Sequence, residues 1–122
     1  MKKKTADFPT VSVSVTFLGG FRLTGKTAAI TDDMNRSQKV WSVLSYLILN
    51  RDRNISQAEF IDTFWSSDKS SNPVNALKTL LYRIRTLLAP VFGPGMDPIV
   101  SQRGSYSWNP AIVCKTDVDE FE

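Results

Sequence analysis

The stretch NPVNALKTLLYRIRTLLA, residues 72–89, decides how the rest of the chain is interpreted. Asn72 is a favourable N-cap and Pro73 suits the first helical position, so a helix is expected to begin here. Pro90 is expected to end it, because the residue before a proline avoids the helical conformation. Six apolar side chains share one face of this helix: Leu77, Leu80, Leu81, Ile84, Leu87 and Leu88. The stretch therefore predicts an amphipathic helix with one buried face.

The opposite face of this predicted helix carries only cationic and neutral hydrogen-bonding groups. Its members are Asn75, Lys78, Thr79, Tyr82, Arg83, Arg85 and Thr86, and residues 69–96 contain no acid. The DNA major groove admits a helix, and a carboxylate there would face rows of phosphates. Arg and Asn can read guanine and adenine with paired hydrogen bonds, while Lys and Tyr commonly hold phosphates. We predict that this face, except Thr86, contacts DNA; the alternative is a solvated face that lacks acids by chance.

Two shorter helices are expected before this one. Ser37 can cap a helix that runs to about Asn50, and its apolar residues recur at helical spacing. Ser56 followed by Glu59 is a capping box, which predicts that a second helix opens at residues 55–56. The polar residues 66–71 then connect the second helix to the third.

Strands are expected on both sides of the helices. Residues 11–18 alternate apolar and polar side chains, and turn glycines separate them from shorter strands at 21–24 and 27–30, which predicts an antiparallel meander. After the helices, residues 99–101 and 106–108 predict a hairpin with its tip at 102–105. Arg103 at this tip is a further candidate DNA contact, because an arginine can enter a narrow minor groove. The alternative is an exposed turn arginine.

This order of elements predicts an α+β fold of the winged helix-turn-helix type. It combines an N-terminal antiparallel β meander, a three-helix core and a C-terminal β-hairpin wing. The expected organisation is a disordered basic tail at 1–10, a winged-helix domain at 11–114 and an acidic segment at 115–122. Residues 115–122 carry a net charge of −3. Because the whole chain carries +3, residues 1–114 carry +6. A local excess of positive charge favours a polyanionic partner.

Composition excludes several other functions. The 122 residues include no histidine and one cysteine, which excludes Ser-His-Asp and Cys-His nucleophiles, histidine-ligated metals, four-cysteine zinc sites and internal disulfides. Cys114 is interpreted as a part-buried residue near the end of a strand. We therefore expect no enzymatic activity, no cofactor and no metal. No apolar run approaches ~18 residues, and the basic start is not followed by the apolar segment of a signal peptide. A cytoplasmic protein without membrane contact is therefore expected.

Four stretches, in order, resemble the OmpR/PhoB-type winged helix of the Streptomyces antibiotic regulatory protein and bacterial transcriptional activator family. They lie within residues 13–121. The first is residues 15–19 with Phe21; the second is Ile55-Ser56 with residues 59–62 and Phe64-Trp65. The third is residues 75–77, 82–85 and Leu88, and the fourth is residues 104–106. The segment 90–98 is longer than the family pattern, and Tyr82 stands where a smaller or basic residue is common.

The resemblance implies more than the residues alone. It implies binding to direct repeats as a tandem or dimer, activation of transcription, and contact of RNA polymerase with residues 66–71. The ending 117–121 resembles the lead-in to a helical second domain. A receiver domain, as in a response regulator, is expected on the N-terminal side of a larger regulator.

We therefore expect a sequence-specific double-stranded DNA-binding domain of a bacterial transcription regulator. Helix 72–89 is expected in the major groove and hairpin 99–108 on the adjacent backbone or minor groove. The alternative is a winged helix that serves as a protein–protein interaction module, for which exposed apolar anchors on the third helix would be the sign.

Overall fold

The computed structural model describes residues 11–26, 28–34, 37–66, 72–93 and 95–117, and the expected basic tail at 1–10 lies outside this range. The elements, in order, are β1 (Val11–Thr16), β2 (Arg22–Thr24), β3 (Ala29–Thr31), a 3-10 turn η2 (Asp32–Met34), α1 (Gln38–Leu49), β4 (Ile55–Ser56), α2 (Gln57–Trp65), α3 (Pro73–Phe92), β5 (Ile99–Gln102), β6 (Ser105–Trp108) and β7 (Ile112–Thr116). Among these described helices, none is long and apolar enough to cross a membrane.

Each of the three helices is capped by the residue that the sequence predicts as its cap. Ser37 caps α1, Ser56 caps α2 and Asn72 caps α3, each with a side-chain oxygen that accepts a backbone N–H three residues on. Each cap satisfies one of the N–H groups that a helix start leaves without a partner. The capping box is only half formed, however. The Glu59 carboxylate binds Arg53 and Tyr46, which come from the preceding connector and α1.

The predicted end of the third helix is wrong. Pro90 lies inside α3, which continues to Phe92. Pro90 has no N–H, so the helix loses one hydrogen bond to the carbonyl four residues back, but it does not end there. The extra residues also pack: Val91 and Phe92 lie against the core, and the Phe92 and Trp108 rings are 6.3 Å apart.

The N-terminal strands form a four-stranded sheet in the order β3-β2-β1-β7. The pairs within β1, β2 and β3 are antiparallel, as the meander predicts, while β7 joins β1 in parallel. The predicted domain end at residue 114 falls inside β7. Beyond that strand, the Asp117 carboxylate accepts hydrogen bonds from the backbone N–H groups of Phe17 and Leu18, both at 2.9 Å. The described fold therefore includes residues 115–117, because their backbone and side chains complete the sheet.

A second, three-stranded sheet has the order β4-β6-β5. Ile55–Ser56, expected to open the second helix, instead form the short strand β4, which pairs with β6. The backbone N–H of Gln57, at the start of α2, donates to the carbonyl of Gly104 at 2.8 Å. The hairpin is thus joined to the beginning of α2.

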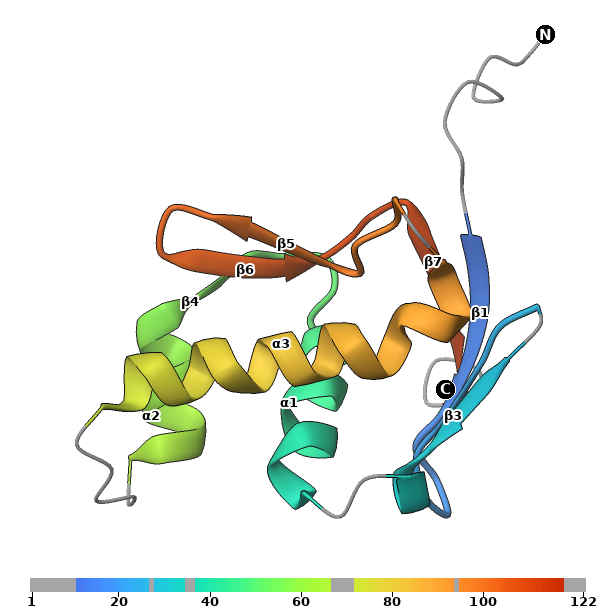
Figure 1. Ribbon diagram of the computed structural model, residues 1–122, viewed down its shortest axis with the longest axis horizontal. Coiled ribbons are helices and arrows are strands. Elements are labelled where there is room, and N and C mark those ends of the chain that lie inside the picture. Colours follow the sequence, from blue (N-terminus) through green and yellow to red (C-terminus); the bar gives the residue numbers. More distant parts are fainter. Residues whose placement is uncertain (1–10, 27, 35–36, 67–71, 94, 118–122) are drawn as a thin grey trace, which may run out of the picture.

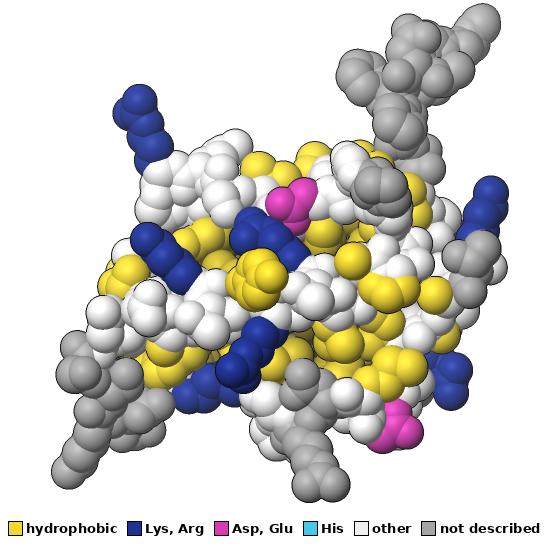
Figure 2. Space-filling view, in the orientation of Figure 1, with side chains coloured by type: hydrophobic (Ala, Val, Ile, Leu, Met, Phe, Trp, Pro, Cys, Tyr) yellow, Lys and Arg dark blue, Asp and Glu magenta, His cyan; other side chains and the backbone are white. Residues whose placement is uncertain are grey.

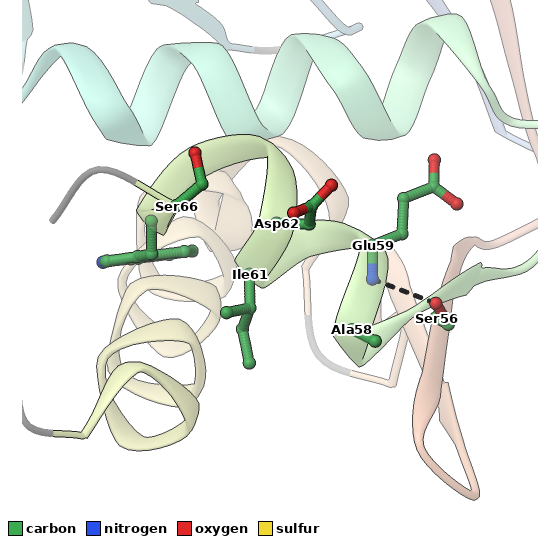
Figure 3. A pocket seen from close by; sticks show the side chains of 7 residues that line it. Ser56, Ala58, Glu59, Ile61, Asp62 and Ser66 are labelled. Carbon is green, nitrogen blue, oxygen red and sulfur yellow. Dashed lines mark hydrogen bonds between the residues drawn. The ribbon is translucent and has the colours of Figure 1, made fainter.

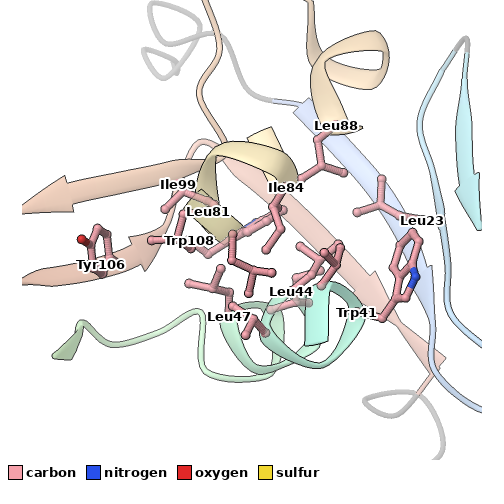
Figure 4. Close-up of a cluster of buried hydrophobic side chains, with 14 of the residues drawn as sticks. Leu23, Trp41, Leu44, Leu47, Leu81, Ile84, Leu88, Ile99, Tyr106 and Trp108 are labelled. Atoms are coloured by element: carbon pink, nitrogen blue, oxygen red, sulfur yellow. The ribbon is translucent and has the colours of Figure 1, made fainter. Parts of the chain in front are cut away.

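Helix α3 crosses the molecule between these parts (Figure 1). The β5–β6 hairpin lies along one side of it, α1 and α2 lie on the other, and the four-stranded sheet stands at its C-terminal end. Five of its six predicted core residues are buried, namely Leu77, Leu80, Leu81, Ile84 and Leu88, whereas Leu87 is only partly buried. Figure 4 shows Leu81, Ile84 and Leu88 of α3 among Leu44 and Leu47 of α1, Leu23 of β2 and Trp108 of β6. This core fixes which face of α3 remains outside.

Candidate nucleic-acid interface

The outer face of α3 presents five of the predicted contact residues to solvent. Asn75, Lys78, Thr79, Tyr82 and Arg83 are all exposed, and the Tyr82 side chain is 68% exposed. Residues three, four and seven positions apart lie on one side of a helix, so these groups form a continuous strip opposite the buried leucines. The arrangement is that of a helix held firmly on one side and available for recognition on the other.

Two neighbours shape the surface around Tyr82. Thr86 donates its hydroxyl to the Tyr82 carbonyl at 3.0 Å, a bond back into the helix that orients this side chain. A shallow hollow is lined by Tyr82, Arg83, Thr86 and the partly buried Leu87. The aromatic ring and the arginine therefore stand at the edge of a small apolar depression rather than on a flat surface.

Arg85 differs from the other predicted contacts. Its Nε lies 3.0 Å from Asp97 Oδ1, and its Nη2 donates to the Ile99 carbonyl at 3.1 Å and to Ser101 Oγ at 3.0 Å. Its side chain is 31% exposed. The guanidinium thus lies against β5 and forms its hydrogen bonds within the protein.

Arg103 is exposed at the turn between β5 and β6. The turn is possible because Gly104 has φ 66°, a left-handed conformation that side chains disfavour. The hairpin turn and the N-terminal end of α3 lie at the same end of the molecule (Figure 1). Figure 2 shows Lys and Arg side chains over α3 and at the end of the hairpin, and few acidic side chains on this face. The outer side of α3 and the end of the hairpin therefore both present cationic side chains on this face.

Two carboxylates, those of Glu59 and Asp62, lie on α2. A shallow groove there is lined by Ser56, Ala58, Glu59, Ile61, Asp62, Trp65 and Ser66 (Figure 3). Hydrogen bonds from Arg53 and then from Tyr46 lower the pKa of Glu59 to about 2, so it stays ionised at neutral pH. The residues predicted to contact polymerase, 66–71, lie outside the described residues except for Ser66.

The strand β4, which pairs with β6 of the hairpin, was not predicted from the sequence. Two residues leave almost no periodic signal, and Ser56 also carries a clear cap signal for α2. The only available sign was the β-branched Ile55 directly before the cap. Cys114, expected to be part-buried, is buried in β7 at 7% exposure. Among residues 11–117, apart from the undescribed positions, no cluster of three or more potential metal ligands occurs.

Comparison with known proteins supports the resemblance seen in the sequence motifs. No known family profile matches the chain. The chain is 32% identical over 66 residues to the regulatory protein AfsR of Streptomyces griseus, which covers 54% of this chain but 6% of AfsR. The chain thus spans a small part of that relative's length.

Two solved structures share the fold. Mycobacterium tuberculosis EmbR, solved in complex with a low-affinity phosphopeptide, superposes with a TM-score of 0.62 at 19% identity. The superposed part covers 80% of this chain and 25% of EmbR. The C-terminal domain of NsrR, a lantibiotic response regulator for nisin resistance, gives a TM-score of 0.57 at 21% identity, over 79% of this chain and 93% of that domain. The suspected resemblance is confirmed, and the two solved structures share the mixed α+β fold of this chain.

Proposed function

We propose that this chain is a sequence-specific double-stranded DNA-binding domain of a bacterial transcription regulator. The observation that carries the proposal is the outer strip of α3, in which Asn75, Lys78, Thr79, Tyr82 and Arg83 are exposed beside a hairpin that carries Arg103. An exposed helix face with hydrogen-bonding and cationic groups fits the major groove, whose base edges are rich in acceptors. The regulatory names of the similar proteins support the same assignment.

In the proposed complex, α3 enters the major groove and the β5–β6 hairpin lies on the adjacent backbone or in the minor groove. Asn75 and Arg83 read base edges, Lys78 and Tyr82 hold phosphates, and Arg103 reaches the backbone or minor groove from the hairpin. The domain needs no cofactor and performs no catalysis in this role. Activation of transcription, tandem or dimeric binding on direct repeats, and polymerase contact through residues 66–71 are further parts of the proposal, and they rest on the family resemblance.

Selection of bound sites from random double-stranded DNA tests this function. We expect the chain to enrich a defined motif, and the motif length and half-site spacing to show whether one or two copies bind. Binding to the selected site is then measured at several salt concentrations, and the logarithm of the affinity should fall linearly with the logarithm of salt concentration. Failure to enrich any motif, or an affinity that ignores salt, would overturn the proposal.

A further inference from the structure

The β5–β6 hairpin is attached to the helices along both of its strands. On one side, β6 pairs with β4, and the Gly104 carbonyl accepts the Gln57 N–H at the start of α2. On the other side, Arg85 of α3 binds the Ile99 carbonyl and the Ser101 hydroxyl of β5. The hairpin therefore bridges α2 and α3 rather than extending freely into solvent.

Asp97 completes the attachment to α3. Its Oδ1 accepts from Arg85 Nε at 3.0 Å and from the backbone N–H of Ile99 at 3.0 Å. One carboxylate oxygen thus joins the arginine of the helix to the first residue of β5. Because the guanidinium is planar and its donors have a fixed geometry, these bonds set the direction of approach as well as the distance.

We propose that Arg85 is a positioning residue and not a DNA contact. It holds the hairpin at a fixed place beside α3, so that Arg103 and the outer strip of α3 reach one DNA duplex together. This inference rests on the proposed function and deepens it. A phosphate that approached Arg85 would have to displace Asp97, and Asp97 itself would repel that phosphate.

The two roles of Arg85 predict opposite effects for Asp97→Ala. If Arg85 positions the hairpin, the variant loses the Asp97 part of the attachment and keeps only the bonds from Arg85 to Ile99 and Ser101, so affinity for the selected site falls by up to about tenfold. If Arg85 bound phosphate directly, removal of Asp97 would free a cation, remove a repelling charge and raise the affinity. Asp52→Ala is the matched control, because it removes an exposed acid from the connector before β4. Affinity of Asp97→Ala equal to or above that of Asp52→Ala overturns the proposal.

Asp97→Asn separates geometry from charge. The amide oxygen of asparagine can still accept from Arg85 and from the Ile99 N–H, so affinity is expected to stay within about twofold of the wild type. A loss as large as that of Asp97→Ala would overturn the positioning role, because the charge and not the hydrogen-bonded geometry would then account for the effect. The thermal unfolding of each variant is measured alongside, so that loss of fold is recognised.

A double-mutant cycle with Arg103 provides a readout that a purely stabilising role would not affect. Arg103→Ala should weaken binding about tenfold in the wild type but less than about threefold in the Arg85→Ala background, since the hairpin there is no longer held against the DNA. Equal losses of affinity in both backgrounds would show that Arg85 and Arg103 are not coupled and would overturn the proposal.

Hydrogen exchange without DNA keeps this inference separate from the proposed function. In Arg85→Ala, the Ile99 amide and the β5–β6 amides should exchange faster, while those of β1 and β7 should not change. If the chain selects no DNA but this pattern appears, the DNA-binding proposal fails and the attachment stands as a feature of the fold. Unchanged exchange in the hairpin contradicts the attachment itself.

Discussion

The Glu59 carboxylate is held from both of its oxygens by the guanidinium of Arg53. Arg53 Nη1 lies 3.0 Å from Oε1 and Nη2 lies 2.6 Å from Oε2, and the Tyr46 hydroxyl also donates to Oε2. These contacts join α1, the connector after it and α2. They connect α1 to α2, the two helices on which α3 packs.

This network makes the free energy of unfolding depend on pH in the acid range. The pKa of Glu59 falls from its ordinary 4.5 to about 2 in the folded chain, first because of the hydrogen bond from Arg53. A lowered folded-state pKa gives stability that is present above pH 4.5 and is lost as the pH falls towards 2. The free energy of unfolding of the wild type should therefore fall more steeply across this window than that of Glu59→Gln. Denaturant unfolding followed by circular dichroism at a series of pH values measures this, with Asp52→Asn as the control. An identical fall in wild type and Glu59→Gln would contradict the assignment.

Arg83→Ala is expected to cost about 1–3 kcal/mol of specific DNA binding and to relax base preference at one position of the site. The physical reason is the loss of paired hydrogen bonds to a guanine edge. Arg22→Ala removes the same charge from an exposed position of β2 and serves as the control. Fluorescence anisotropy with the selected site and with single-base variants measures both effects. If the two variants bind alike, Arg83 does not read the site.

Lys78→Ala should act differently, because Lys78 is assigned to a phosphate. Its loss should weaken binding to all sequences by a similar factor and reduce the slope of affinity against salt by about one. Titrations of specific and unrelated DNA at several salt concentrations test this. A loss confined to the selected site would assign Lys78 to a base edge instead.

Gly104→Ala should destabilise the chain by about 1–2 kcal/mol through its backbone alone. A Cβ on Gly104 would meet no atom within 4 Å, but φ is +66°. Gly104→Asn should lose less, because asparagine tolerates this conformation better than alanine. Thermal unfolding of the three proteins should show the wild type as the most stable, Gly104→Asn as the next and Gly104→Ala as the least stable. A loss for Asn as large as that for Ala would point to a cause other than the backbone conformation.

Leu81→Ala should cost about 2–5 kcal/mol of stability, because it leaves a cavity in the core. Leu81 is 1% exposed, whereas Leu87, on the same predicted stripe, is partly buried beside Tyr82. Leu87→Ala should therefore cost clearly less than Leu81→Ala. Chemical denaturation of both variants checks the ranking, and equal losses would show that the edge of the stripe is packed as tightly as its centre.

Much of the fold was predictable because its signals are local. Caps at Ser37, Ser56 and Asn72 act within one turn, and the apolar spacing of α1 and α3 describes one helix at a time. The hairpin was predictable from the two strand-like stretches 99–101 and 106–108 on either side of its tip. The strand β4, the parallel pairing of β7 and the extension of α3 past Pro90 depend on partners far away in the chain, and no local pattern carries them.

The same division applies to the candidate interface. The sequence alone determined the acid-free face of α3 and its opposition to a leucine stripe, because helical geometry turns spacing into direction. Only the tertiary structure decided that Arg85, on that same predicted face, binds Asp97 and β5, residues 12 to 16 positions away. Helical periodicity gives the direction in which a side chain points but not what packs there. What packs there is set by the docking of the hairpin, which the whole core determines.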